Sequence, residues 1–511
     1  MKLIKKNYYG IVEGFFSRPL PKWTTKERLN VLKFVTANAK SINTYFYCPK
    51  DDSYVTKKWS SLYPEAELNE LRKTINYCKK NKITFVYGFN PTIDNNERQI
   101  TQDIVIKVKQ IKEIGCNHFC LLFDDIPVAY DVVDKNVQGT LPVIKSIVKV
   151  VNKVYSQIKD DIENLWFCGP DYCLSKETLI TKELRTISKD ISFIWTGRNI
   201  FVKNITLKDF RTAQKVVDKK RGLIWWSNYP ANDCEQSVGT FNLGGFNGPS
   251  QEALRNLRGI LFNPMRESYA NFPFLLTFID YLKEKDKYDR VKSWKKALKK
   301  LLGRNWKNYE LILENFSSRN ITDDNFKYFY RQTRPRLTQK YLTYLGDILR
   351  NLKITHPETR EGKLFINVIG SVLEDADGFL KIVGKILAKK LISKKEFKKW
   401  DKFPTNTEVT KYLPEIFKIA QKRLEILPKN LYSETKLAYL QDATENFQDK
   451  YRGGKKLFMP KWAVFKIKDV IRQITNLEAT AFVKFFNSPD FSPREKVEAL
   501  ALRQNINRFY C

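Results

Sequence analysis

Two adjacent carboxylates, Asp124 and Asp125, directly follow an apolar run in the segment Leu121–Ile126. The pair has three interpretations: a loop-capping Asp beside a solvated one, a metal site, or the acid–base pair of a glycosidase. No third carboxylate or His stands at a spacing that supports a metal site. Ordinary glycosidases carry carboxyl groups on two sides of the scissile bond. Neighbouring residues at one strand end should lie on the same side, which favours substrate-assisted catalysis, in which the sugar's own 2-acetamido oxygen attacks the anomeric carbon.

The elements that must position this pair are short apolar runs between Tyr8 and about residue 283. The runs are β-branched and aromatic and are continuous rather than alternating, as is typical of parallel strands buried on both faces. Helix-like segments separate them, which predicts βαβ units. Eight units over about 275 residues predict an α/β fold, a (β/α)8 barrel. The expected strands are 10–16, 44–48, 84–89, 118–123, 165–169, 192–196, 223–227 and 259–262.

A doubly wound open sheet is the rival architecture. Its nucleotide-binding form carries a Gly-rich phosphate loop after the first strand, and no such loop follows Gly10–Phe16. The helices expected between the first strands have apolar residues at helical spacing. They cover 25–37, 65–80, 101–114 and 141–158.

The polar residues that follow the expected strands are the candidate site, because eightfold barrels carry their sites at the carboxyl ends of the strands. Acids, amides and aromatics converge there, with two His in the whole chain and no Cys–His pair. Such a lining suits a sugar, since amides and carboxylates bond hydroxyl groups and an indole stacks on a pyranose face. The candidates include Gly14, Lys50, Asp52, Asn90, Asp124, Asp125, Asp171, Tyr172, Trp226, Asn228, Asp233 and Asn263.

Seven stretches beside the predicted strand ends resemble glycoside hydrolase family 84, the O-GlcNAcases and their bacterial hyaluronidase-like relatives. The stretches occur in family order over roughly residues 8–283, and the order makes the resemblance specific. They are 10–19, 43–52, 121–126, 170–173, 195–197, 226–233 and 263–264.

The resemblance implies a role for each acid and for the acetamido pocket. Asp124 would orient the 2-acetamido group, and Asp125 would be the general acid/base. Tyr172 and Asn228 would stabilise the oxazoline, and Trp226 would form a pocket wall.

The resemblance also implies ligands for the sugar hydroxyls. These are Gly14, through its carbonyl, Lys50, Asp233 and Asn263. One departure is Phe16-Ser17, where the family has an aromatic residue followed by Gly, so a tyrosine hydroxyl is missing.

A second domain is predicted from about residue 286 to 511, where apolar spacing becomes helical and no strand run stands out. We expect a basic all-helical domain there, possibly two helical subdomains, after a catalytic domain at 1–285. Residues 281–511 hold 49 Lys and Arg against 27 Asp and Glu, within a whole chain of net charge +34. Such a charge permits binding to nucleic acid or an acidic polymer. The basic residues are scattered rather than striped, which favours a solvated surface.

The cysteines and the amino-terminal segment bear on the compartment. The eight Cys mostly stand in apolar runs, which indicates buried thiols in a reducing compartment rather than a disulfide framework. The amino-terminal segment lacks the apolar core of a signal peptide, and no stretch is long enough to span a membrane. The expectation is a cytoplasmic protein, with secretion of a processed form left open.

The residues at the strand ends and the family resemblance together imply a retaining exo-β-N-acetylglucosaminidase that acts through an oxazoline and needs no metal or cofactor. Its partner would be a protein or glycan bearing terminal β-linked GlcNAc, with O-GlcNAc on Ser/Thr as the leading substrate. One alternative is an enzyme directed at hyaluronan or another glycan. The other is an idle barrel whose basic helical domain binds nucleic acid or an acidic polymer. The oligomeric state stays open.

Overall fold

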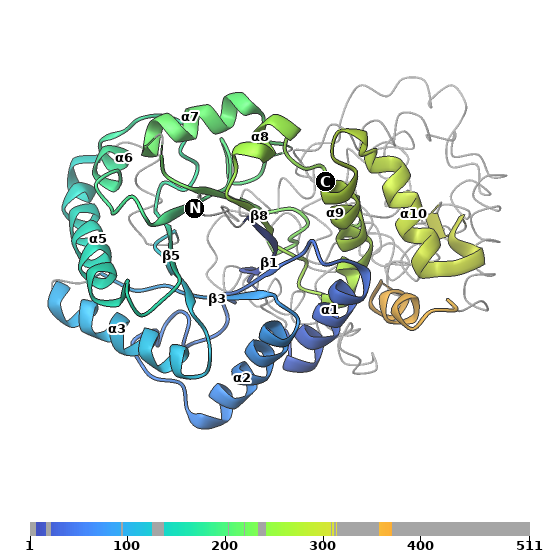
Figure 1. Cartoon of the computed structure of the whole chain (residues 1–511), viewed down its shortest axis with the longest axis horizontal. Coiled ribbons are helices and arrows are strands. Elements are labelled where there is room, and N and C mark those ends of the chain that lie inside the picture. Colours follow the sequence, from blue (N-terminus) through green and yellow to red (C-terminus); the bar gives the residue numbers. More distant parts are fainter. Residues whose placement is uncertain are drawn as a thin grey trace, which may run out of the picture. The chain divides into compact units, whose positions relative to one another are not determined.

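A computed structural model describes the chain at residues 7–16, 22–93, 96–124, 137–202, 204–218, 220–233, 242–307, 309–310, 313 and 357–369 (Figure 1). By internal packing the chain divides into two compact units, 1–231 with 245–294 and 232–244 with 295–511. The first unit contains every strand described below.

Eight parallel strands close into a barrel in sequence order, and β8 pairs with β1. The predicted (β/α)8 barrel is thus confirmed. Each expected strand has a counterpart, although the first ends at Glu13 and not at Phe16, since the Gly14 N–H bonds the Val12 carbonyl and the Asn263 side chain instead of a neighbouring strand. The strands are β1 (Tyr8–Glu13), β2 (Thr44–Tyr47), β3 (Thr84–Phe89), β4 (His118–Leu122), β5 (Asn164–Cys168), β6 (Ser192–Trp195), β7 (Leu223–Ser227) and β8 (Gly259–Phe262).

Aromatic side chains fill the barrel. The ring centroid of Trp166 lies 4.9 Å from that of Tyr8 and 5.8 Å from that of Phe46. The ring centroids of Phe46 and Trp226 are also 5.8 Å apart. All four side chains are at most 5% exposed. The interior is therefore a packed core, and a ligand site belongs at its rim, as in other barrels of this kind.

An outer ring of helices covers the strands (Figure 1). The four predicted helices are present, and α3 begins four residues earlier than expected because Asn96 caps it. The helices are α1 (Thr25–Asn38), α2 (Glu65–Lys80), α3 (Glu97–Glu113), α5 (Val137–Ile158), α6 (Leu179–Leu184), α7 (Leu207–Val217), α8 (Gln251–Asn256), α9 (Phe272–Glu284) and α10 (Arg290–Leu302).

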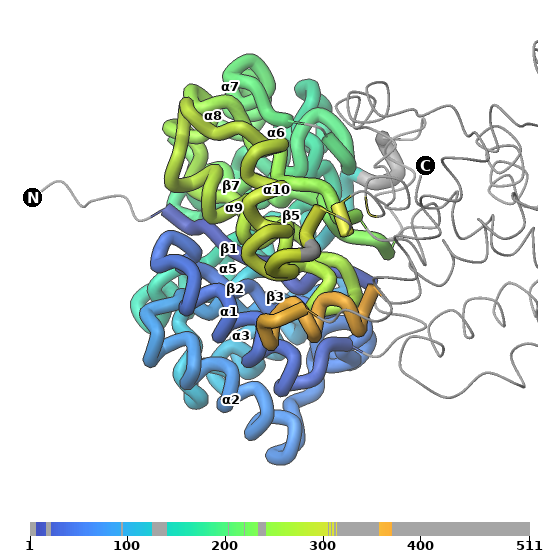
Figure 2. Tube along the Cα trace, turned by 90° about the vertical axis from the view of Figure 1, so that its right-hand side faces the viewer, coloured from blue at the N-terminus to red at the C-terminus, as the bar shows by residue number. Residues whose placement is uncertain are grey.

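The capping box at the start of α1 fixes where the first helix begins. Thr24 accepts a hydrogen bond from the main-chain N–H of Glu27, whose carboxylate accepts one from the main-chain N–H of Thr24. The helix then packs on α9, where the ring of Phe34 stacks on Phe272 at 4.1 Å. The two helices lie side by side in Figure 2.

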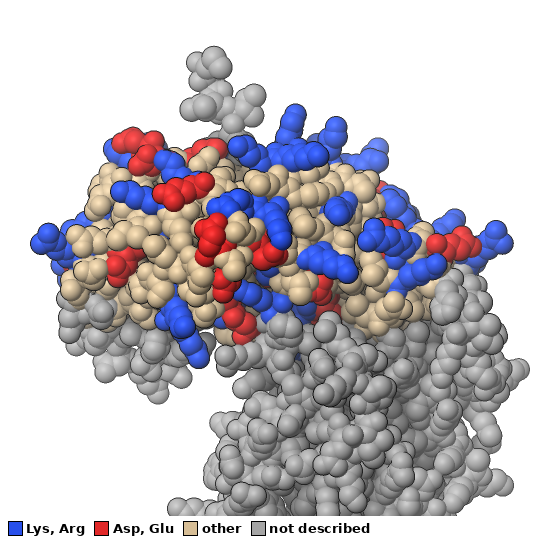
Figure 3. Space-filling view, turned by 90° about the horizontal axis from the view of Figure 1, so that it is seen from below, with Lys and Arg blue, Asp and Glu red and all other residues tan. Residues whose placement is uncertain are grey.

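Most of the predicted helical domain, 286–511, lies outside the described residues. Its described parts are helical, at 290–302 and 360–369, and within the second unit Thr359 Oγ1 donates to the Leu301 carbonyl at 2.7 Å. The boundary near residue 285 stays a prediction. On the face of the molecule seen in Figure 3, Lys and Arg predominate along the upper right edge, and elsewhere Asp and Glu lie among them. None of the described helices is long and apolar enough to cross a membrane.

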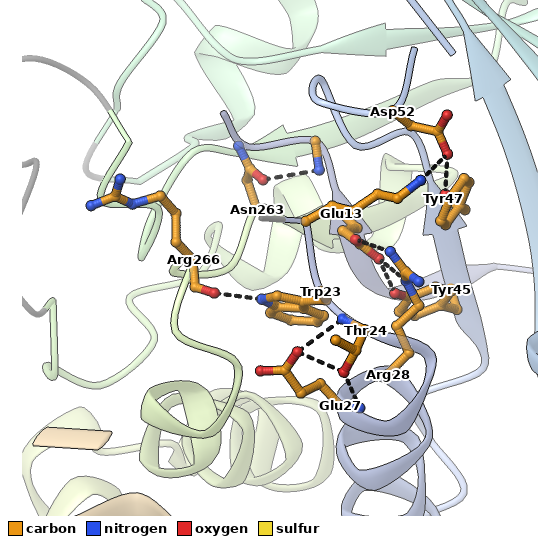
Figure 4. A network of polar contacts seen from close by, with 12 residues as sticks. Glu13, Trp23, Thr24, Glu27, Arg28, Tyr45, Tyr47, Asp52, Asn263 and Arg266 are labelled. Carbon is orange, nitrogen blue, oxygen red and sulfur yellow. Dashed lines mark hydrogen bonds and ion pairs between the residues drawn. The ribbon is translucent and has the colours of Figure 1, made fainter. Parts of the chain in front are cut away.

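A buried ion pair joins the end of β1 to α1 (Figure 4). The Glu13 carboxylate is fully buried and accepts from the Arg28 guanidinium at 2.7 and 2.8 Å. The Tyr45 hydroxyl donates to the same carboxylate, and the guanidinium lies over the Tyr47 ring at 4.9 Å. Burial alone lowers the pKa of Arg28, but the Glu13 carboxylate raises it well above its ordinary value. The guanidinium therefore neutralises a charge that water cannot reach, and the Tyr45 hydroxyl donates a further hydrogen bond to it.

Breaking this pair should destabilise the barrel strongly. Arg28→Met leaves the Glu13 carboxylate buried with one hydroxyl donor, so we expect the free energy of unfolding to fall by about 3–5 kcal/mol. Urea unfolding followed by tryptophan fluorescence measures it. The control is Arg72→Met, which breaks an exposed pair with Glu65 whose side chains are 38% and 69% exposed, and should cost less than about 1 kcal/mol. Equal effects of the two variants would contradict the assignment.

Candidate active site

The barrel brings most of the predicted site residues to one end. Parallel strands of a closed barrel share their carboxyl edge, so residues that follow the strands meet at a common rim. Gly14, Asn90, Asn228 and Asn263 come directly after β1, β3, β7 and β8, and Trp226 lies within β7. Lys50, Asp124 and Tyr172 follow β2, β4 and β5 by three, two and four residues.

Asp124 receives a hydrogen bond on each carboxylate oxygen. Lys50 Nζ donates to Oδ2 at 2.9 Å, and Asn90 Nδ2 donates to Oδ1 at 3.2 Å. The side chains of Lys50 and Asp124 are 5% and 12% exposed, so solvent screens this pair little. The sequence placed Asn90 at a strand end but assigned it no role, and only that position signalled the contact.

A second hydrogen-bonded group joins β1, β7 and β8. The main-chain N–H of Gly14 donates to Asn263 Oδ1 at 3.3 Å, and Asn263 Nδ2 donates to Asn228 Oδ1 at 3.3 Å. Trp226 Nε1 donates to the same oxygen at 2.7 Å, while Asn228 Nδ2 donates to the Ile200 carbonyl at 2.9 Å. Four residues that sequence reasoning chose separately thus form one polar group.

Gly14 is required by close approach rather than by its backbone angles. A Cβ at this position would lie 2.3 Å from Cζ2 and 2.4 Å from Cη2 of Trp226. Any other residue would push the indole out of place. Trp226 is 5% exposed and rests edge-on against Phe46, so it has little room to move.

Asp52 organises the segment that carries Lys50. Its carboxylate accepts from Lys22 Nζ at 2.9 Å, from the Tyr47 hydroxyl at 2.5 Å and from the Tyr63 hydroxyl at 3.1 Å. The main-chain N–H of Tyr54 donates to its other oxygen at 2.9 Å. Burial alone raises the pKa of Asp52, but the Lys22 ammonium and these donors lower it below its ordinary value. The carboxylate is therefore the fixed centre of the β2–α2 connection.

The remaining predicted residues are placed less fully. Tyr172 is half-buried, and its carbonyl accepts from the main-chain N–H of Thr196 at 3.1 Å. Burial raises the pKa of its neighbour Asp171, whose Oδ1 accepts from the main-chain N–H of Leu174 at 3.2 Å. Asp233 is half-buried and belongs to the second compact unit. Asp125 lies outside the described residues.

Thiol chemistry does not fit this site. Burial raises the pKa of the Cys48 and Cys120 thiols well above their ordinary value, so both are protonated at neutral pH and are poor nucleophiles. Within the described part of the chain, no three His, Cys, Asp or Glu side chains gather closely enough to hold a metal ion. The groups that the structure describes at the strand ends are a carboxylate, an ammonium, amides and an indole. Fold and site together define a barrel protein with a site that suits a polar, sugar-like ligand.

Comparison with known proteins names the family. The family model described as beta-N-acetylglucosaminidase matches residues 9–317. The protein O-GlcNAcases of Rattus norvegicus and Mus musculus are each 30% identical over 284 residues, which is 54% of this chain and 30% of each relative. The chain thus spans about a third of the length of these relatives. A mutant O-GlcNAc hydrolase of Thermobaculum terrenum has the same fold, with a TM-score of 0.64 at 19% identity over 89% of this chain and 99% of the other.

The chain therefore belongs to the beta-N-acetylglucosaminidase family, glycoside hydrolase family 84. The matched residues include the barrel from Tyr9 onward and every strand end described above. The resemblance read from the seven sequence stretches is confirmed.

The stabilisation that the Asp52 carboxylate gives the barrel should be lost in acid. Because its pKa is lowered in the folded chain, its contribution is complete above the unfolded value of about 3.9 and is lost as pH falls through the folded value. We expect Asp52→Asn to lower the free energy of unfolding by about 1.5–3 kcal/mol at pH 7 and by progressively less below about pH 4. Urea unfolding of both proteins between pH 7 and pH 3 measures the difference. A difference that does not shrink in acid would show that the charge of Asp52 is not what stabilises the fold.

Proposed function

We propose that this chain is a retaining exo-β-N-acetylglucosaminidase that removes terminal β-linked GlcNAc by substrate-assisted catalysis. Family membership supports the sugar. The observation that carries the mechanism is the Asp124 carboxylate at the rim of the barrel, held on both oxygens and still 12% exposed. A carboxylate fixed in this way can accept the N–H of a substrate acetamide.

In the first step Asp124 orients the acetamide of the bound sugar. The acetamide oxygen attacks the anomeric carbon, the bond from that carbon to the leaving oxygen breaks, and Asp125 gives its proton to the leaving oxygen. The acetamide nitrogen then carries the positive charge of an oxazolinium ion, which Asp124 stabilises. In the second step Asp125 takes a proton from water, whose oxygen attacks the same carbon and restores the acetamide. Two inversions retain the β configuration.

The second polar group would form the pocket around the acetamide. Tyr172 and Asn228 would stabilise the oxazoline, and Trp226 would be the wall. Asn228 can act only in one orientation, because its amide is already bound on both sides by Trp226, Asn263 and the Ile200 carbonyl. This preorganisation removes the entropic cost of fixing an amide when the substrate arrives.

The sugar hydroxyls would be bound by groups from four segments. We propose the Gly14 carbonyl, Lys50, Asp233 and Asn263 as their ligands, with no metal or cofactor. Lys50 would then serve both Asp124 and the sugar, which its three donor hydrogens allow.

We propose protein-linked O-GlcNAc as the substrate, because the curated relatives are named protein O-GlcNAcases. A hyaluronan- or other glycan-directed enzyme is the alternative, and the positive charge of the chain suits an acidic polymer. The basic domain proposed at 286–511 would contact the carrier of the sugar. An idle barrel that binds nucleic acid through this domain is disfavoured by the intact hydrogen bonds around Asp124 and Asn228.

The proposed mechanism needs the acetamide of the substrate. The chain should hydrolyse an aryl β-GlcNAc, and an aryl β-glucoside with the same leaving group should react at least about a thousandfold more slowly, because it lacks the internal nucleophile. Release of the aryl alcohol, followed by absorbance, gives kcat/KM for both. Comparable turnover of the two substrates would exclude the oxazoline route.

Loss of Asp124 and loss of Asp125 should differ in how the rate of hydrolysis depends on the leaving group. Asp125→Ala should lower cleavage of a poorly activated aryl GlcNAc by about 10²–10⁴-fold and spare a strongly activated one, because a good leaving group needs no acid. Asp124→Ala should slow both substrates, since the nucleophile is no longer aligned. Asp161→Ala, at the amino end of the barrel, is the control and should change neither rate. Matching leaving-group profiles for the first two variants would refute the assigned roles.

A further inference from the structure

The side chain of Asp124 can rotate about its terminal torsion, which is broad for carboxylates. One donor does not fix the plane of a carboxylate, and Lys50 reaches Oδ2 on a flexible four-carbon stem with three rotatable hydrogens. Asn90 Nδ2 is a second donor and binds the other oxygen, Oδ1. With one donor on each oxygen, rotation of the carboxylate about its terminal torsion is restricted. Asn90 is thus the residue that determines where the remaining lone pairs of Asp124 point.

We propose that Asn90 is a positioning residue for the hydrolysis, acting through Asp124 to aim its carboxylate at the acetamide N–H of the bound sugar. This inference rests on the proposed function, in which Asp124 orients the acetamide. No contact of Asn90 with the substrate is needed.

The main chain of Asn90 is well anchored for such a role. It directly follows β3, whose last residue, Phe89, is fully buried. Its N–H donates to the Val55 carbonyl at 2.8 Å, and Val55 is fully buried in the β2–α2 connection. The same connection carries Lys50. The two donors to Asp124 therefore come from segments that a main-chain hydrogen bond joins.

The other half of the Asn90 amide argues against a role in stability. Its Oδ1 is buried and finds no hydrogen-bond donor among the residues that the structure describes. The opposite amide orientation would place this oxygen against the carboxylate of Asp124, where two hydrogen-bond acceptors would face each other with no proton between them. Among the described residues, the bond to Asp124 is the one hydrogen bond that this side chain makes, so this contact favours Asn at the position.

The test is Asn90→Leu, which keeps the approximate size of the side chain and removes both polar atoms. We expect kcat on an aryl β-GlcNAc to fall by about ten- to a hundredfold with KM changed by less than about threefold, because alignment is lost rather than binding. The midpoint of thermal unfolding should change little, because removal of the unsatisfied Oδ1 offsets the loss of the hydrogen bond to Asp124. The matched control is Asn164→Leu at the amino end of β5, where the amide contacts His118 at 3.2 Å. It should leave kcat unchanged.

A double-mutant cycle separates positioning from general damage. In an Asp124→Ala background, measured on a strongly activated aryl GlcNAc, Asn90→Leu should cause less than about a twofold further loss, because its effect passes through the missing carboxylate. A merely structural role would multiply the two losses. That result would overturn the proposal.

Asn90→Asp is the second variant and keeps the shape of the side chain. It replaces the donor by a carboxylate beside Asp124, so kcat should fall at least as far as in Asn90→Leu. Wild-type kcat in either variant would overturn the role of Asn90, provided that the unmodified chain cleaves the substrate. If the unmodified chain leaves the aryl GlcNAc intact, the proposed function itself fails, and the inference fails with it.

Discussion

The site depends on one charge that water cannot reach, the carboxylate of Glu13 at the end of β1. A buried carboxylate is tolerated only when donors surround it, so Arg28 of α1 and Tyr45 of β2 must approach it closely. These contacts hold the carboxyl end of β1 against α1 and β2. Gly14 is the next residue. The Trp226 indole packs against its main chain, and its N–H donates to the Asn263 side chain. The geometry of one side of the site thus follows from the neutralisation of Glu13.

The two polar groups of the site have different foundations. The group around Asn228 rests on strands directly, since its four residues lie in or next to β1, β7 and β8. The group around Asp124 includes Lys50, which lies in a connection between a strand and a helix. Such a connection needs its own internal support, and Asp52 provides it through three side-chain donors and one main-chain donor. A carboxylate away from the chemistry thereby gives a connecting segment the rigidity of a strand end.

The sequence was sufficient for the barrel because continuous apolar runs that alternate with helix-like segments are typical of parallel strands buried on both faces. It was also sufficient to place Gly14, Asp124 and Asn263 at strand ends, since the carboxyl edge of a barrel is common to all strands. It was not sufficient for Arg28 or Asn90. Arg28 stands in a helix where a charged residue ordinarily faces solvent, and its burial depends on Glu13, fifteen residues away. The contact of Asn90 depends on side-chain direction across two neighbouring strands, which periodicity does not report.

The acids at the rim of this barrel differ in whether they support the fold or face the proposed site. Glu13 and Asp52 are buried acids whose oxygens are used by protein donors, and they support the fold. Asp124 has donors on both oxygens but keeps 12% of its surface open, so its partners aim it without enclosing it. Asn90 contributes still less to the stability of the fold, because its buried Oδ1 has no donor in the described structure. Unsatisfied groups are rare in native interiors, so this oxygen next to the partly buried Asp124 fits the positioning role proposed for Asn90 better than a role in the stability of the chain.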